Sequence, residues 1–208
     1  MNLREQLQLW SDQLRAIAND GLHWSSDNPY HRQRFERVRR IAAELFAAQD
    51  EREPETIERI FSADLSHVAP YPGGDAAIIN AAGEMLLIQR KDDQLWAMPG
   101  GLLEVGETPA EGTCREAWEE TGIAVAPVAL VGVYDSRRCD SRTTAQLYQF
   151  VFLCRPVESA PQPVVTNETL AVGWFAEDKL PPLSPGHTLR IPDAFRFWRS
   201  ATPKTVFV

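Results

Sequence analysis

The stretch that decides the fold reads Gly101-Leu-Leu-Glu-Val-Gly-Glu107-Thr-Pro-Ala-Glu-Gly-Thr-Cys-Arg115-Glu116-Ala-Trp-Glu119-Glu120-Thr-Gly122-Ile123. Its second half predicts a helix over residues 109–121, because local signals mark both ends. Thr108 is a good N-cap, Pro109 suits the first helical position, and Glu111 completes a capping box. Gly122 stands where a left-handed C-terminal cap is expected.

The last turn of this helix carries Glu116, Glu119 and Glu120 on one face, within an arc of roughly 100°. Like charges at these spacings repel, and anions near a helix C-terminus oppose the helix dipole, so the arrangement costs on the order of 1–2 kcal/mol. Either Arg115 or a divalent cation with carboxylate ligands is expected to offset this cost. The alternative is a solvated acidic face with an ordinary Glu111–Arg115 pair, which leaves the glycines of the stretch unexplained.

The stretch resembles the complete Nudix box, which reads Gly, five residues, Glu, seven residues, then Arg-Glu-apolar-x-Glu-Glu-x-Gly-apolar. Every position of the box is matched: Gly101, Glu107, Arg115, Glu116, Ala117, Glu119, Glu120, Gly122 and Ile123. At ordinary residue frequencies, chance would produce such a match on the order of once in 10⁶–10⁷ chains of this length. The preceding Trp96-Ala-Met-Pro-Gly-Gly also resembles the usual approach to the box.

The resemblance implies an α/β fold, the Nudix-type α/β/α sandwich with a mixed sheet. It also implies Mg²⁺ or Mn²⁺ bound by the helix carboxylates and one backbone carbonyl, namely Glu116, Glu119, Glu120 and Gly101. One glutamate or one metal ion would activate water, while Glu107 and Arg115 would orient and support the ligands. This agrees with the chemistry, because a diphosphate repels a nucleophile until cations neutralise its charge.

The chain before the box is expected to form two parts. Leu3, Leu7, Trp10, Leu14 and Ile17 form an apolar seam along a first helix, and two further helical patterns follow over residues 31–49 and 54–62. We therefore expect a small all-helical domain over residues 1–66 and a Nudix domain over residues 67–208. The seam either forms a homodimer or packs on the other two helices.

Several shorter elements are predicted after the helical part. Residues 69–74 read as a linker, and residues 75–80 and 84–90 as a β-hairpin around Ala81-Ala82-Gly83. Residues 95–98 lead into the box, and strands are expected over residues 129–135, 147–154 and 171–175. The proline-rich residues 156–165 are expected to form a surface loop.

The helical start and the tail around Asn167-Glu168-Thr169 resemble a bacterial Nudix subgroup associated with ADP-ribose and CDP-choline. The expected reaction is therefore hydrolysis of the diphosphate bond of a nucleoside diphosphate linked to another moiety. Glu168 is either a further ligand or general base, or a surface glutamate. Arg90, Arg137 and Arg138 either bind the substrate phosphates or are solvated.

Two other functions share this sequence pattern. A hydrolase of modified nucleoside triphosphates that releases pyrophosphate would have the same box. Many ADP-ribose hydrolases carry a proline about sixteen residues beyond the box, and Cys139 at this position favours CDP-alcohols over ADP-ribose. A ligand-sensing regulator on a Nudix scaffold is disfavoured, because the box is intact and such proteins tend to lose its carboxylates.

The composition of the chain restricts the classes of molecule that it is expected to bind. The net charge of −8 lacks the excess of basic residues that nonspecific nucleic-acid binding requires, so we expect no nucleic-acid partner and a small nucleotide substrate. No apolar run is long enough to span a bilayer, so no membrane partner is expected. The three cysteines show no paired spacing, which suits a reducing cytoplasm.

Overall fold

The computed structural model describes residues 2–24, 28–63, 68–141, 143–158 and 161–208 of the chain. The chain divides into two compact units, one made of Met1–Pro70 with Arg142–Gln146 and one made of Tyr71–Ser141 with Leu147–Val208. The expected boundary at residues 66 and 67 lies outside the described residues. We call the two parts the helical unit and the catalytic-box unit.

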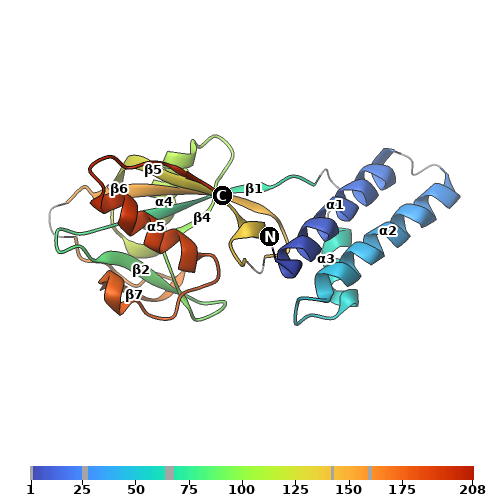
Figure 1. Cartoon of the computed structure of the whole chain (residues 1–208), viewed down its shortest axis with the longest axis horizontal. Coiled ribbons are helices and arrows are strands. Elements are labelled where there is room, and N and C mark those ends of the chain that lie inside the picture. Colours follow the sequence, from blue (N-terminus) through green and yellow to red (C-terminus); the bar gives the residue numbers. More distant parts are fainter. Residues whose placement is uncertain (1, 25–27, 64–67, 142, 159–160) are drawn as a thin grey trace. The chain divides into compact units, whose positions relative to one another are not determined.

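The helical unit contains α1 (Leu3–Trp24), α2 (Pro29–Ala47) and α3 (Pro54–Ala63), and Figure 1 shows these three helices together. The expected all-helical N-terminal region is confirmed. Asn28 caps α2 through its side-chain oxygen, which accepts from the backbone N–H groups of Tyr30 and His31. The core of the unit is small: Ala42, Ala43, Phe46, Ile57 and Phe61, with Leu14 packed against it.

The first helix continues beyond the apolar seam. α1 continues to Trp24, seven residues beyond Ile17, and the following residues 25–27 lie outside the described part. Its buried face is mostly polar, and the Ser11 hydroxyl donates a hydrogen bond to the Ala42 carbonyl at 2.7 Å. The full set of buried α1 residues is Gln8, Ser11, Asp12, Arg15, Ala18, Asn19 and Leu22.

The apolar seam of α1 therefore lies mainly outside this core. Leu3, Trp10 and Ile17 expose 72%, 46% and 55% of their surface, and Trp24, one further heptad along, exposes 81%. Leu14 alone among these packs on the core of the unit. Of the two alternatives for the seam, packing on the other two helices is thus excluded for Leu3, Trp10 and Ile17, because polar residues occupy that face of α1 instead.

The catalytic-box unit contains two sheets. The larger has the order β4-β1-β6-β5-β8, and the smaller has the order β3-β2-β7. In the larger sheet β1 pairs with β6 in parallel and with β4 in antiparallel orientation, so the expected mixed sheet is confirmed. The strands are β1 (Tyr71–Ile78), β2 (Met85–Arg90), β3 (Trp96–Ala97), β4 (Gly100–Leu102), β5 (Val125–Asp135), β6 (Leu147–Pro156), β7 (Thr169–Phe175) and β8 (Val206–Phe207).

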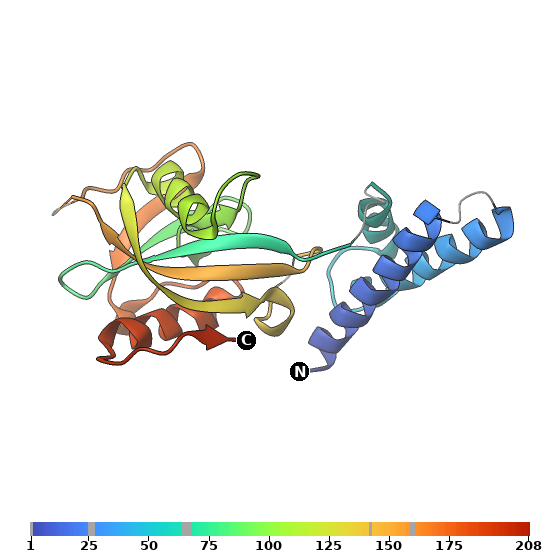
Figure 2. The same cartoon turned by 90° about the horizontal axis from the view of Figure 1, so that it is seen from above.

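Two long helices cover opposite faces of the larger sheet, α4 (Pro109–Thr121) and α5 (His187–Arg199); Figure 2 shows them above and below it. Because successive side chains of a strand point to opposite faces of the sheet, those of β1 pack in two different cores, one beside α4 and one beside α5. Ala76 and Ile78 of β1 join the α4 core, whereas Ala77 and the neighbouring Ile79 join the α5 core. This is the layered α/β/α arrangement that the box implied.

The expected linker and hairpin need correction. Residues 71–74 belong to β1, and Gly73 and Gly74 pair with both β4 and β6. Asn80 and Glu84 do form the expected turn, since the Asn80 N–H donates to the Glu84 carbonyl at 2.9 Å. However, the flanking strands β1 and β2 diverge into different sheets after a single bridge between Ile79 and Met85, so no extended hairpin forms.

The helix α5 has no counterpart among the expected elements, because Pro192 lies inside it and hides the helical pattern. Strands β4 and β8 are also additional, and each has only two or three residues. The other strands lie near their expected positions, although β5 and β7 begin earlier and β6 ends later than expected. Residues 159 and 160 of the expected surface loop lie outside the described part.

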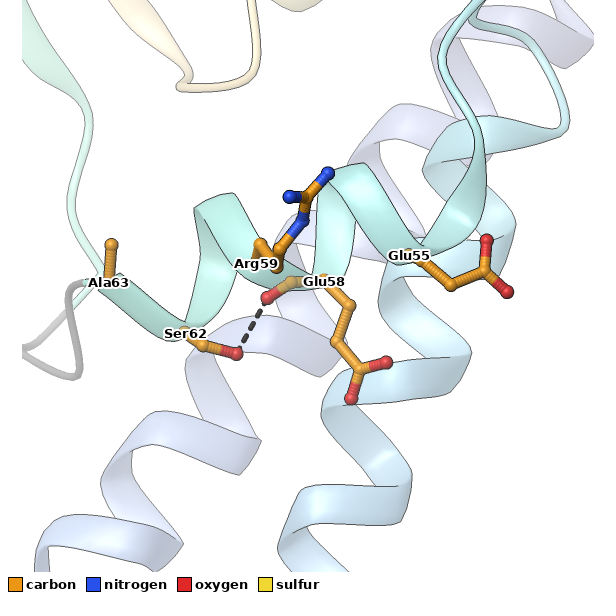
Figure 3. A pocket seen from close by; sticks show the side chains of 5 residues that line it. All are labelled: Glu55, Glu58, Arg59, Ser62 and Ala63. Atoms are coloured by element: carbon orange, nitrogen blue, oxygen red, sulfur yellow. Dashed lines mark hydrogen bonds between the residues drawn. The ribbon is translucent and has the colours of Figure 1, made fainter.

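One open cavity of about 480 Å³ belongs to the helical unit (Figure 3). All of its lining residues come from α3 or its end: Glu55, Glu58, Arg59, Ser62 and Ala63. The Ser62 hydroxyl donates to the Glu58 carbonyl at 2.6 Å, which is a bond within the helix. No residue of the box lines this cavity. Within the described residues, no helix is both long and apolar enough to cross a membrane.

Candidate active site

The helix α4 presents the box glutamates, and both of its predicted ends are confirmed. The Thr108 hydroxyl accepts from the Glu111 N–H at 3.3 Å, and the Glu111 carboxylate accepts from the Thr108 N–H at 2.8 Å. This reciprocal capping box holds the first turn. Gly122 adopts a φ of 70° and closes the last turn by donating to the Trp118 carbonyl.

Arg115 joins the charged residues of the box. Its guanidinium pairs with both carboxylate oxygens of Glu107, at 2.6 and 3.1 Å. One nitrogen, Nη1, donates to both Glu116 and Glu119, at 2.9 and 2.8 Å. Thus Arg115 offsets the glutamate cluster, and Glu111 is engaged in capping rather than in the ordinary pair with Arg115 considered above. The hydrogen bonds from Arg115 also hold the pKa of Glu107 below its usual value.

Glu116 lies directly against the backbone of Gly101. A Cβ atom at residue 101 would sit only 2.6 Å from the Glu116 carboxyl carbon, so the close approach requires glycine. Burial raises the pKa of Glu116, and repulsion from Glu119 and Glu168 adds to this effect against the opposing influence of Arg115. Excess negative charge is therefore concentrated on the side of α4 that faces Gly101 of β4.

Glu120 is the most perturbed of the box carboxyls. Burial raises its pKa to about 8, and the negative charges of Glu116 and Asp75 act in the same direction. The Gly100 N–H donates to Glu120 Oε2 at 2.8 Å, which opposes the shift and fixes the side chain beside the loop. A perturbed carboxyl with a fixed orientation is typical of a functional site.

The donor set fits a hard divalent cation, because carboxylate oxygens and a backbone carbonyl are the ligands that Mg²⁺ and Mn²⁺ favour. Glu116 lies against Gly101, Glu120 accepts from the Gly100 N–H, and Glu119 shares the Arg115 guanidinium with Glu116. Burial raises the pKa of Glu116 and of Glu120, and neighbouring negative charges, which a cation would offset, add to both shifts. Over the described residues, no three His, Cys, Asp or Glu side chains already form a group that could hold a metal ion. Arg115 donates to one oxygen of Glu116 and one oxygen of Glu119, so it leaves the second oxygen of each carboxylate for a cation.

The structure brings two further predicted residues near this centre. Glu168 is exposed, and its charge acts on Glu116. Arg90 ends β2, and its charge acts on Glu120. The Arg90 guanidinium also forms a two-pronged ion pair with Asp92, at 2.9 and 2.5 Å. Both residues therefore lie within electrostatic reach of the box glutamates, one from a loop and one from a strand end.

The remaining predicted arginines belong to the short 3-10 turn after β5, Ser136–Arg138. Arg137 is buried, with 2% of its surface exposed, and its backbone N–H donates to Asp135. Arg138 is exposed. Cys139, which follows this turn, packs in the α5 core. Thus only Arg138 of this pair is open to solvent.

Three residues near the site were not anticipated. Asp75 of β1 and Arg190 of α5 form a buried ion pair of 2.6 Å, and His187 of α5 accepts from the Met98 N–H at 3.3 Å. Asp75 could have been noticed as a lone carboxylate in an otherwise apolar strand. His187 and Arg190 offered no such signal, because their helix was not recognised.

Comparisons with known proteins agree with this architecture. The model of the Nudix domain family matches residues 71–194, and that of a UDP-X-like N-terminal oligomerisation domain matches residues 5–61. A Bacillus subtilis (strain 168) protein named "Putative ADP-ribose pyrophosphatase YjhB" is 32% identical over 200 residues, covering 95% of this chain and 94% of that protein.

Solved structures show the same relationship. An ADP-ribose pyrophosphatase from Streptococcus suis is 28% identical with a TM-score of 0.59, covering 67% of this chain and all of that one. A UDP-X diphosphatase shares the fold along 99% of both chains, with a TM-score of 0.60 and 24% identity. With an intact box on a capped helix and a family match over most of its length, the chain belongs to the Nudix family and is a Nudix hydrolase, with an N-terminal region that matches the UDP-X-like domain model.

Proposed function

We propose that this Nudix hydrolase is a metal-dependent pyrophosphohydrolase that cleaves the diphosphate bond of a nucleoside diphosphate linked to a sugar or an alcohol, such as ADP-ribose or CDP-choline. The products would be a nucleoside monophosphate and the phosphorylated second moiety. The observation that carries the proposal is the glutamate cluster on α4 facing the Gly100–Gly101 loop. The full-length similarity to YjhB supports a diphosphate-linked substrate over a triphosphate.

In this mechanism Glu116, Glu119, Glu120 and the Gly101 carbonyl would hold Mg²⁺ or Mn²⁺. When bound, the cation supplies charge neutralisation of the diphosphate and acidification of the attacking water. Arg115 and Glu107 orient the glutamates through their shared hydrogen bonds. Glu168 would act as a general base or a further ligand, and Arg90 and Arg138 would bind the phosphates, with Arg137 a weaker candidate because it is buried.

The direct test is a substrate panel with each metal: ADP-ribose, CDP-choline, a UDP-sugar, a dinucleotide and a modified triphosphate, with products separated by chromatography. Nucleoside monophosphate from a diphosphate-linked compound is the expected result. Pyrophosphate released from the triphosphate alone would refute the proposal in favour of the triphosphate hydrolase. No product from any compound with either metal would refute it in favour of a ligand-sensing regulator.

Site variants test the metal-binding role separately from the substrate. Glu119→Gln and Glu120→Gln are expected to lower kcat by at least a hundredfold without unfolding the protein, since each removes a charge from the proposed ligand set. Glu104→Gln is the matched control, because Glu104 is an exposed carboxylate in the same box and lies outside the ligand set. Wild-type kcat in both α4 variants would refute the proposed ligands.

We also propose that the enzyme is a homodimer joined through α1. Leu3, Trp10, Ile17 and Trp24 recur every seven residues along its exposed side, which is the spacing of helix-to-helix contacts. The matching family model describes this region as an oligomerisation domain. Light scattering should give about twice the chain mass of 23.4 kDa for the wild type. Ile17→Glu should give the single-chain mass, whereas the control Gln13→Glu, also exposed on α1, should stay dimeric.

A further inference from the structure

Residues 98–101 run from the end of β3 into the first two residues of β4, and we call this segment the loop. Its backbone contacts the box glutamates. Its Gly100 N–H donates to Glu120, and Gly101 lies against Glu116. The Pro99 carbonyl accepts from the Ala76 N–H at 2.8 Å, so β1 also holds the loop. The position of this loop therefore sets the position of Glu120.

The helix α5 contacts the same loop from the other face of the sheet. The Met98 N–H donates to Nδ1 of His187, and both residues are at least 97% buried. This bond requires a neutral imidazole with its proton on the other nitrogen. Two residues before the loop, the Trp96 carbonyl accepts from the Ser184 N–H at 2.8 Å. The segment that leads into α5 thus fixes the start of the loop.

A second contact runs through a buried ion pair. Arg190 Nη1 donates to Asp75 Oδ2 at 2.6 Å, and the two side chains expose only 6% and 4% of their surface. Arg190 Nε also donates to the Gly186 carbonyl at 3.2 Å, which anchors the guanidinium to the first turn of α5. Asp75 pairs with Gly100 in the β1–β4 register, so this ion pair lies directly behind the loop.

The Asp75 carboxylate fills the space beside the Gly100 Cα. A Cβ built at Gly100 would lie 2.8 Å from Asp75 Oδ1 and 2.2 Å from the Gly74 carbonyl oxygen. Desolvating two charges is costly, and apolar residues of similar volume often replace such pairs without loss of stability. The buried pair therefore calls for a role other than stability alone.

We propose that His187 and Arg190 of α5 are positioning residues, which hold residues 98–101 from behind the sheet and so fix Glu120 in its working orientation. The line of contact runs from Arg190 through Asp75 to Gly100 and from there to Glu120. This inference rests on the proposed function for its effect on catalysis, and on the loop geometry alone for its structural part.

The first test compares variants of similar size that differ in their capacity for hydrogen bonding. His187→Gln keeps an acceptor for the Met98 N–H, and His187→Leu removes it. Arg190→Lys keeps the charge but loses the fork that joins Asp75 to the Gly186 carbonyl. We expect His187→Leu and Arg190→Lys to lower kcat at least tenfold with KM within twofold, and His187→Gln to restore kcat to within threefold of the wild type.

The matched control is Tyr134→Phe. This change removes a buried hydrogen bond of 3.0 Å from Tyr134 to Asp193, which also lies on α5 and whose described polar partners, Tyr134 and Arg196, lie outside residues 98–101. Its kcat should stay within twofold of the wild type. If Tyr134→Phe lowers kcat as much as Arg190→Lys does, or if the loss of kcat simply follows the loss of thermal stability across the set, the positioning role is refuted.

Two readouts are independent of turnover. In ¹⁵N-glycine-labelled protein without metal, Arg190→Lys should shift the Gly100 amide resonance while leaving that of Gly21, which lies on α1 against Phe35 of α2, unchanged. Mn²⁺ titration followed by electron paramagnetic resonance should show at least threefold weaker binding in Arg190→Lys and wild-type binding in Tyr134→Phe. An unchanged Gly100 amide together with unchanged Mn²⁺ affinity would overturn the inference, even if the wild type hydrolyses the expected substrates. A shifted Gly100 amide in a protein that hydrolyses none of the panel would support the inference and refute only the proposed function.

Discussion

Acidification should destabilise the protein through His187, and the size of the effect follows from its surroundings. The imidazole is buried beside two cationic side chains, Arg190 and Arg90, and its Nδ1 accepts from the Met98 N–H. Burial comes first among the causes that lower its pKa well below the ordinary 6.5, and the two arginine charges add to it. The folded protein thus keeps His187 neutral at a pH where the unfolded chain protonates it.

The sign follows from proton linkage. Below pH 6.5 the unfolded state binds a proton that the folded state does not, so the free energy of unfolding falls as pH falls. Between pH 7.5 and pH 5.5 the protonated fraction in the unfolded chain rises from about one tenth to about nine tenths, which lowers stability by ~1.4 kcal/mol. The loss continues at lower pH until the folded-state pKa is reached.

The assay is urea unfolding of the wild type and His187→Gln at pH 5.5, 6.5 and 7.5, followed by far-UV circular dichroism and tryptophan fluorescence. The variant cannot bind the proton, so its stability should fall less over this range, by ~1.4 kcal/mol. His31→Gln, which changes an exposed histidine of α2, shows how far an unrelated histidine alters the slope. Equal slopes in the wild type and His187→Gln would refute the assignment of a neutral, buried His187.

Three further predictions concern α4 and its loop. Thr108→Ala removes the N-cap and should lower the free energy of unfolding by about 1 kcal/mol, whereas Thr108→Ser should not, as measured by urea unfolding. Gly122→Ala places a side chain at a φ of 70° and 2.6 Å from Val164, so the same assay should show a loss of at least ~1 kcal/mol. Gly101→Ala forces the Glu116 carboxylate away from its position beside residue 101. The kcat should therefore fall at least a hundredfold, and Mn²⁺ binding should weaken in a calorimetric titration. Wild-type kcat together with wild-type Mn²⁺ affinity would contradict the close approach of Glu116 to Gly101.

The helix α4 was predictable from sequence because its determinants are local. Thr108, Pro109, Glu111 and Gly122 each act within one turn of the helix end that they mark, and the structure places both ends where these residues predicted. The helical pattern expected over residues 54–62 also begins where α3 does, at Pro54, because proline suits the first turn of a helix. Spacing within the helix also predicted the crowding of the glutamates, although it left open whether Arg115 or a cation offsets them.

The separation of β1 from β2 could not be predicted in the same way. The turn at Asn80–Gly83 has the local chemistry of a hairpin, and the turn does form. Whether the strands stay paired depends on the other strands: β4 and β6 occupy the two edges of β1, and β3 and β7 occupy those of β2. Because β6 and β7 begin only at Leu147 and Thr169, far along the chain from the turn, no local pattern indicates the outcome.

The unexpected polar interior of the helical unit and the buried pair of the catalytic-box unit share one cause. Apolar spacing on α1 indicates that one face is to be buried, but it does not say against what, and here the face that meets α2 is polar. Asp75 and Arg190 are 115 residues apart in sequence, and they form their ion pair only because α5 packs against β1. In both cases the sequence identifies groups that need a partner, and the fold alone identifies the partner. A box motif therefore indicates which residues perform the chemistry, whereas the residues that hold them in place must be found in the structure.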